Sequence, residues 1–221
     1  MNDFDKAKKL LKEFKGDSYL YGENVLSKVG DVAKRAGGGN ALLIADSFDS
    51  IKPFIKEVKD SLDKAGITLK KHVDGPRPNA PVEDVYRLAD EVKKENPDIV
   101  ISFGGGSTVD SGKAAETLRT LGGDLEDYFG TGKVTEVLEK TGKKLHPHIA
   151  IQAASSSGAQ LTKYSNITNL ETGQKKLIVD EGIVPQYPVF DYRVTHSSPK
   201  NLTMDGGLDG IAHMLEVLYG A

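Results

Sequence analysis

A glycine-rich turn carries the clearest chemical signal in the sequence. The apolar run 99–103 leads directly into Gly104-Gly105-Gly106-Ser107, and a helical pattern starts at once. Ser107 is predicted to cap that helix, with Asp110 as its capping-box partner. Without a Cβ, glycines let an anion approach the backbone, and the helix N-terminus favours negative charge. The turn therefore predicts a diphosphate site, with a tight turn that binds nothing as the alternative.

The spacing of this turn differs from two common phosphate-binding motifs. A P-loop has four residues before its Gly-Lys pair, but five separate Gly106 from Gly112, and Ala114 follows Lys113 where Ser or Thr is needed. A Rossmann fingerprint has glycine at its sixth position, which is Val109 here. The sequence therefore argues against both motifs.

Two further groups of polar residues are candidates for ligand contacts. Asp46 follows the apolar run 41–45, where a carboxylate can accept hydrogen bonds from an adenosine ribose and repel a 2′-phosphate. That position favours NAD over NADP, although a plain strand-end aspartate in a turn is the alternative. Asp209 and His213 are four residues apart in a helical pattern, so they can face one divalent cation or form a surface hydrogen bond.

Short apolar runs alternate with helical patterns, which predicts an α/β domain with a parallel sheet and right-handed crossovers. The expected strands lie at residues 41–45, 67–73, 99–103 and 148–151. The expected helices lie at residues 53–65 and across 85–92, and an amphipathic helix opens the chain. The signals are again helical from Pro199 onward, and the segment 207–218 keeps one apolar face. Segments 164–170 and 175–179 flank a polar turn and predict a hairpin. We predict a nucleotide-type domain over 1–195 and the first helices of a second domain over 196–221.

Composition excludes several classes of protein. The chain has 221 residues, a formal net charge of −3 and no dense Lys/Arg run, which argues against nucleic acid and anionic membrane as partners. It has no cysteine, so disulfide frameworks, thiolate metal sites and cysteine nucleophiles are excluded. The apolar runs are short and the N-terminus is charged, so we expect a cytoplasmic protein.

The ordered segments resemble the iron-containing alcohol dehydrogenase family, within the dehydroquinate-synthase-like superfamily. GGGSTVDSGKA is similar to the family signature GGGS-x-x-D-x-x-K-A, and GGLDGIAHMLE is similar to G-x-D-A-x-x-H-x-x-E. PHIAIQAASSSGAQLTKYSNI takes the place of the segment I-P-T-T-A-G-T-G-S-E-x-T. PNAPVEDV and LLIAD are similar to the family's N-P-T-x-x-x-V loop and strand-end aspartate. The resemblance runs in order from residue 18 to residue 221.

The resemblance implies an NAD(P)-binding N-terminal domain and an all-helical C-terminal domain, with Fe²⁺ or sometimes Zn²⁺ between them. It implies hydride transfer between a small alcohol or aldehyde and the nicotinamide, in a homodimer. The cofactor-binding residues would be Asp46, Asn79, Gly105, Gly106, Ser107, Ser157 and Lys175. The metal ligands would be Asp209 and His213. The sequence assigns no catalytic residue.

Several departures from the family pattern bear on activity. Ala153 and Ala154 replace the paired threonines, Gln160 replaces a glutamate, and Gly210 replaces the alanine of G-x-D-A. The family's metal site takes two further histidines from later helices, but the other four histidines all precede Asp209 and include His148, expected as a polar strand-end residue. We therefore expect an N-terminal portion of such an enzyme. The alternative is a truncated, catalytically inactive nucleotide-binding domain.

Overall fold

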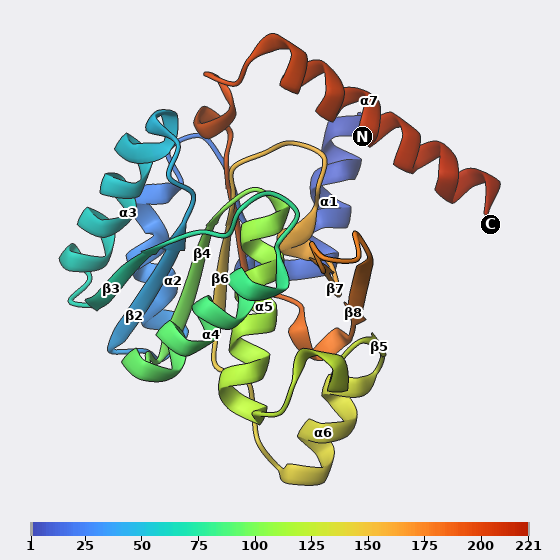
Figure 1. Cartoon of the computed structure of the whole chain (residues 1–221). Helices are drawn as coiled ribbons and strands as arrows, with labels where there is room; N and C mark the ends of the chain where they lie inside the picture. Colours follow the sequence, from blue (N-terminus) through green and yellow to red (C-terminus); the bar gives the residue numbers. More distant parts are fainter. Residues whose placement is uncertain (1, 221) are drawn as a thin grey trace.

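The computed structural model describes residues 2–220 and places a twisted sheet of six parallel strands between two layers of helices (Figure 1). The strand order is β1-β9-β6-β4-β2-β3, and every neighbouring pair is parallel. These strands are β1 (Leu20–Gly22), β2 (Asn40–Ala45), β3 (Thr68–Asp74), β4 (Ile99–Gly104), β6 (His148–Gln152) and β9 (Tyr187–Asp191).

Two pairs of helices cover the two faces of this sheet. One face packs against α2 (Val29–Arg35) and α3 (Lys52–Lys64). The opposite face packs against α4 (Val82–Glu95) and α5 (Gly106–Leu121). Beside α5 lies a three-stranded sheet of order β5-β8-β7, accompanied by α6 (Lys133–Thr141). Its strands are β5 (Gly130–Thr131), β7 (Tyr164–Thr168) and β8 (Lys175–Val179).

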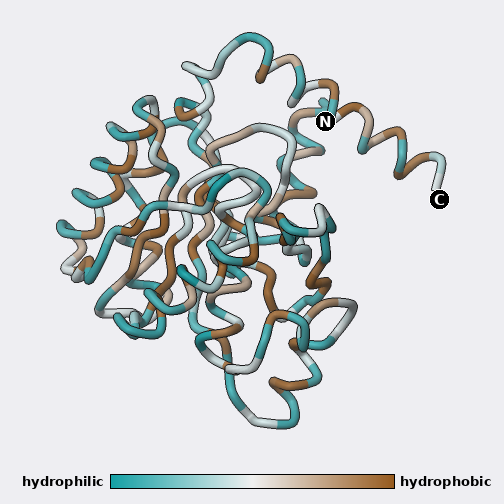
Figure 2. The backbone as a smooth tube through the Cα atoms, viewed as in Figure 1, coloured by the Kyte–Doolittle hydropathy of each residue, from teal (hydrophilic) through white to brown (hydrophobic). Residues whose placement is uncertain are grey.

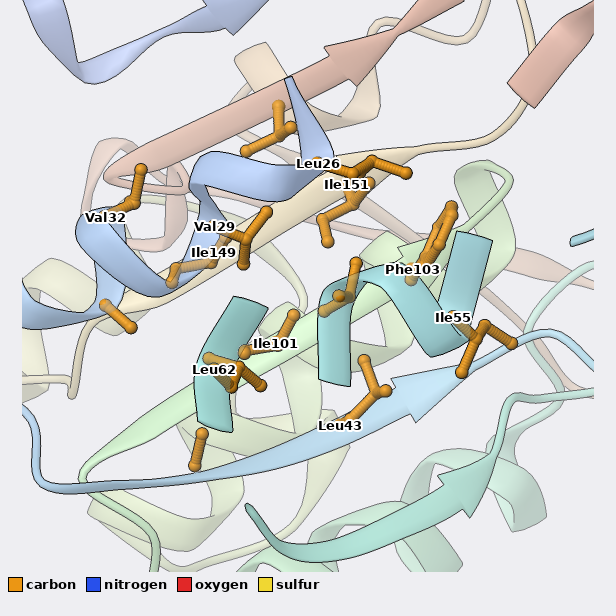
Figure 3. Packing of buried hydrophobic residues seen from close by; sticks show 14 of the residues in the cluster. Leu26, Val29, Val32, Leu43, Ile55, Leu62, Ile101, Phe103, Ile149 and Ile151 are labelled. Atoms are coloured by element: carbon orange, nitrogen blue, oxygen red, sulfur yellow. The ribbon is translucent and has the colours of Figure 1, made fainter. Parts of the chain in front are cut away.

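Successive side chains of the central strands point to opposite faces of the sheet, and both faces are buried, so these strands are almost entirely apolar. In β2, Leu43 packs with the α2 and α3 layer, whereas Leu42 and Ile44 pack with the α4 and α5 layer. Figure 3 shows Leu43 beside Ile101 of β4 on the first of these faces. Strands of a parallel sheet that is buried on both faces consist mainly of hydrophobic residues. Hydrophobic residues accordingly concentrate on the strands and on the helix faces turned toward them (Figure 2).

The structure confirms the expected parallel α/β architecture and the hairpin of β7 and β8. Gly66, which follows α3, has the left-handed φ of +73° expected of a helix stop. The sequence did not predict β1, β5, β9, α2 or α6. No helix within residues 2–220 is long and apolar enough to cross a membrane.

The predicted cap of α5 is wrong. The helix begins at Gly106 with Gly105 as its N-cap, and no side chain caps it. Ser107 lies inside the first turn, where its Oγ accepts a hydrogen bond from the amide of Asn79. The Asp110 carboxylate instead faces Lys113 and Asn166. The helix therefore starts two residues earlier than the capping pattern indicated.

The terminal helices α1 (Asp3–Lys15) and α7 (Lys200–Tyr219) contain no buried residue. In Figure 1, α7 extends beyond the sheet along its carboxyl edge. It is one uninterrupted helix with Pro199 as its N-cap, in agreement with the helical signals expected from Pro199 onward. A 3₁₀ turn ends at Thr195, shortly before α7 begins. A domain boundary near residue 195 stays a prediction.

Candidate functional site

The three glycines lie at the carboxyl end of β4, and each has its own structural reason. A Cβ on Gly104 would lie 2.6 Å from the carboxyl carbon of Asp46, so any side chain there collides with that carboxylate. A Cβ on Gly105 would meet nothing within 4 Å. A Cβ on Gly106 would lie 3.3 Å from the Cβ of Ser157. Gly104 is therefore required for packing, whereas Gly105 leaves open space above the turn.

The backbone at the start of α5 presents hydrogen-bond donors. The first amides of a helix have no intrahelical acceptor. The amide of Gly105 donates to Asp46 Oδ2 at 3.1 Å. Within residues 2–220, the amides of Gly106 and Ser107 have no acceptor. These two donors, with the positive end of a 16-residue helix behind them, suit an anion.

Asp46 packs against the glycine turn. One carboxylate oxygen accepts the Gly105 amide, and the other accepts the hydroxyl of Thr108. Burial raises the pKa of the Asp46 carboxyl above its usual value, against the lowering effect of these two hydrogen bonds. Asp46 also lines a cavity of about 460 Å³ with Arg77 and Arg87. Its predicted contact with a ribose stays a prediction, because the structure shows the carboxylate bonded to the turn.

Most of the other predicted cofactor residues meet in one place. Lys175 Nζ, at the start of β8, donates to Asn79 Oδ1 at 3.0 Å. The amide of Asn79 donates to Ser107 Oγ at 3.0 Å. This hydrogen bond connects the loop between β3 and α4 to the first turn of α5. Asn79, Gly106, Ser107, Ser157 and Lys175 all line a cavity of about 620 Å³. The structure therefore gathers a cation, hydroxyls and free amides around one hollow.

The loop after β6 that contains Ser155, Ser156 and Ser157, here called the serine loop, forms another wall of this cavity. Ser156 and Ser157 line the 620 Å³ cavity and also a neighbouring cavity of about 540 Å³ that reaches α7. Gln152, the last residue of β6, donates from Nε2 to Ser157 Oγ at 2.7 Å and to the carbonyl of Ala154 at 2.6 Å. Gln152 was not among the site residues predicted from the sequence. The available signal was a polar residue at a strand end, three residues before Ser155.

Beside the cavity, α5 carries a buried ion pair whose two members hydrogen-bond to the segment 162–166, which includes the start of β7. Lys113 Nζ lies 3.4 Å from Asp110 Oδ1 and donates to the carbonyls of Thr162 and Tyr164 at 3.0 and 2.6 Å. Burial lowers the pKa of Lys113 to about 8, against the opposing pull of Asp110. Burial likewise raises the pKa of Asp110. This pair fixes the segment that carries Asn166 and Thr162 at the cavity wall.

Asp209 and His213 face each other on α7. His213 Nδ1 lies 3.4 Å from Asp209 Oδ2, and about half of each side chain is exposed. His213 borders the 620 Å³ cavity, and Asp209 borders the 540 Å³ cavity. The described residues contain no group of three or more metal-ligating side chains. The pair offers the right donor types for a divalent cation, but too few of them for a closed site.

A family model described as iron-containing alcohol dehydrogenase matches residues 17–192. The chain belongs to the iron-containing alcohol dehydrogenase family. It corresponds to an N-terminal portion of these oxidoreductases. The family match includes the glycine turn, the serine loop and Lys175, and it ends before Asp209 and His213.

Relatives in this family cover most of the chain. Alcohol dehydrogenase 4 of Schizosaccharomyces pombe is 31% identical over 197 residues, which are 89% of this chain and 45% of that protein. The NAD-dependent methanol dehydrogenase of Bacillus methanolicus is 28% identical, over 89% of this chain and 50% of its own. The chain thus spans about half the length of the curated relatives it matches.

A solved family structure has the same fold. The NADH-dependent butanol dehydrogenase A of Thermotoga maritima superposes with a TM-score of 0.79 at 31% identity, covering 90% of this chain and 48% of that one. The sulfoacetaldehyde reductase of Bifidobacterium kashiwanohense, solved in complex with NAD⁺, superposes with a TM-score of 0.73 at 26% identity, covering 86% of this chain and 48% of that one. These likenesses confirm the predicted dinucleotide-binding type of α/β fold for this iron-containing alcohol dehydrogenase family member.

Proposed function

We propose that this chain is the NAD-binding portion of an alcohol dehydrogenase that moves a hydride between a small alcohol or aldehyde and a nicotinamide cofactor. One observation carries the proposal. The unpaired amides of Gly106 and Ser107 open onto a cavity that also holds the cation of Lys175. Gly105 leaves open space above the same turn. A dinucleotide diphosphate has the charge and the acceptor oxygens that this arrangement suits.

The residues around the cavity would each have a different role in binding the cofactor. The α5 amides would donate to the diphosphate, and Lys175 would balance its charge. Asn79 orients both Lys175 and Ser107 through hydrogen bonds of 3.0 Å. Asp46 holds the Gly105 amide and, in this proposal, faces the adenosine ribose from the neighbouring cavity. NAD bound here would supply the hydride acceptor or donor, and the chain would hold its diphosphate end.

The metal part of the proposal concerns α7. We propose Asp209 and His213 as two ligands of a divalent cation, Fe²⁺ or Zn²⁺, on the basis of their spacing and the family resemblance. Two half-exposed donors do not hold such an ion firmly by themselves.

A second function has a specific observation in its favour. Because the described residues contain no group of three or more side chains that could hold a metal ion, the 221-residue chain would bind NAD without turning over substrate. An assay of this chain with NADH, Fe²⁺ or Zn²⁺ and small aldehydes separates the two functions. Turnover would support the dehydrogenase, whereas binding without turnover would support the binding domain.

The oligomeric state and cellular location that we propose are those expected from the sequence. We propose a homodimer from the family resemblance and a cytoplasmic location from the cysteine-free composition. Small alcohols or aldehydes are the proposed substrates. Neither nucleic acid nor a membrane is a proposed partner.

The experiment that tests the binding proposal is an NADH titration followed by the coenzyme's own fluorescence. The chain contains no tryptophan, which keeps the signal simple. Gly105→Ala puts a methyl group into space that the chain leaves empty, so the loss of stability should be limited to that of a poorer helix N-cap, about 1 kcal/mol or less. Loss of the close approach should weaken NADH binding by about tenfold or more.

Gly39→Ala is the matched control. Gly39 precedes β2 at the amino edge of the sheet, where an added Cβ meets only Asp98 at an ordinary 3.6 Å. This variant should bind NADH like the wild type. If Gly105→Ala also binds like the wild type, the glycine turn does not receive the diphosphate, and the proposal fails.

A further inference from the structure

We propose that Gln152 is a positioning residue that holds the Ser157 hydroxyl as a hydrogen-bond donor toward the cofactor's diphosphate. The inference rests on the proposed function, because it names what supplies one contact of that site. Gln152 is only 1% exposed and ends β6, where it pairs with Gly104 across the sheet. The family segment quoted above has proline at this position, and proline has no side-chain amide to offer.

The orientation of the Gln152 amide follows from its contacts. The atom 2.6 Å from the carbonyl oxygen of Ala154 must be a donor, because a backbone carbonyl oxygen only accepts. That atom is therefore Nε2. The same nitrogen lies 2.7 Å from Ser157 Oγ and donates its second proton there. Both protons of the Gln152 amide are thus committed to the serine loop.

These contacts decide the role of the Ser157 hydroxyl. A hydroxyl has one proton and two acceptor positions. Ser157 Oγ accepts from Gln152 Nε2 and, at 3.4 Å, from the amide of Ala159. Within residues 2–220, its own proton has no acceptor. Ser157 lines the 620 Å³ cavity, next to Gly106. The free proton is therefore available to an acceptor in that cavity, and a phosphate oxygen is the strongest one expected there.

A second feature argues that Gln152 does more than fill space. Its Oε1 is buried and has no hydrogen-bond partner within the described residues. An unsatisfied buried acceptor is unfavourable for folding. An apolar side chain of similar length would avoid that cost. The Gln152 amide therefore costs some folding stability through its unpaired Oε1. Its Nε2 holds the serine loop against the glycine turn.

The test is a double-mutant cycle on NADH affinity with Gln152→Met, Ser157→Ala and the double variant. Methionine keeps the length of the side chain and removes both donors. Each single variant should weaken NADH binding by about tenfold, the value of one lost hydrogen bond to a charged group. The double variant should bind no more weakly than Ser157→Ala, because Gln152 acts through Ser157.

Independent effects would contradict the proposal. If Gln152 only packs the loop, the two losses multiply in the double variant. Wild-type affinity in Gln152→Met would also overturn it. Failure of the wild-type chain to bind NADH would remove both the proposed function and this inference, whereas binding with multiplied losses would remove the inference alone.

A direct measurement covers the case in which Gln152→Met does not fold. Hydrogen exchange of the Gln152 side-chain amide can be followed by NMR in the wild type and in Ser157→Ala. The contact predicts slow exchange in the wild type and faster exchange once Oγ is removed. Equal exchange in the two proteins would show that Gln152 does not hold Ser157.

Discussion

His148 is a buried neutral base at the start of β6. Its Nε2 lies 2.8 Å from Ser102 Oγ, and only 4% of the residue is exposed. Burial, with the nearby Lys113 cation, lowers the pKa of His148 to about 3. The unfolded chain therefore takes up this proton first as the pH falls below the ordinary value of 6.5. Stability is fully present above pH 6.5 and is lost as the pH falls toward 3.

We predict that the free energy of unfolding falls by about 1.4 kcal/mol per pH unit from this residue between pH 6 and pH 4.5. His148→Gln should flatten that slope. The measurement is urea unfolding across this range. His72, whose pKa is also lowered, is unchanged in both proteins, so the difference isolates His148. Identical slopes would show that His148 is not held neutral.

The residue chemistry was only partly predictable from the sequence. The glycine turn indicated a phosphate site because strand, glycines and helix are adjacent in the chain. The sequence could not show that Asp46 bonds the Gly105 amide, because that contact joins residues 59 positions apart. Likewise, His148 looked like a polar strand-end residue, and only the packing of Lys113 and Ser102 around it shows otherwise.

At the scale of elements, the contact between α5 and β7 depends on the buried Lys113. Its side chain is wholly buried and bonded to two carbonyls of the segment that leads into β7. Lys113→Met would leave Asp110 and those carbonyls without their cation. Breaking a buried pair in this way should cost about 3–5 kcal/mol of unfolding free energy.

Lys140→Met is the comparison for that prediction. Lys140 pairs with Glu136 at 2.7 Å on the exposed side of α6. Its removal should cost less than about 1 kcal/mol. Chemical denaturation of both variants measures the difference. Similar small losses in both would mean that Lys113 does not hold the hairpin to α5.

Long, strongly patterned elements were the predictable ones. β2 and β4 lie in the middle of the sheet and read as apolar runs, because both faces are covered. β9 was missed because it contains Pro188, a residue that argues against an interior strand. Without β9, the sheet order next to β6 could not be derived, nor could the place of β1 at the edge.

At the scale of the whole molecule, α7 presents an apolar face that nothing in the described chain covers. Leu208, Ile211, Leu215 and Leu218 are all 47–73% exposed. Exposed contiguous apolar surface promotes association. We predict that the 221-residue chain self-associates at micromolar concentration, as light scattering after size-exclusion chromatography would show.

Ile211→Glu with Leu215→Glu should shift the protein toward monomer without loss of stability, because neither side chain is buried. A monodisperse wild-type monomer would contradict the prediction. The sequence showed the apolar stripe of this helix. It could not show that the helix runs unbroken to Tyr219 along the carboxyl edge of the sheet.

The most direct test of the account is a crystal structure of this chain with NAD⁺ bound. We predict the diphosphate within hydrogen-bond distance of the Gly106 and Ser107 amides, with Lys175 and Ser157 also in contact. Density for the coenzyme elsewhere on the molecule, with the glycine turn free, would contradict the central claim.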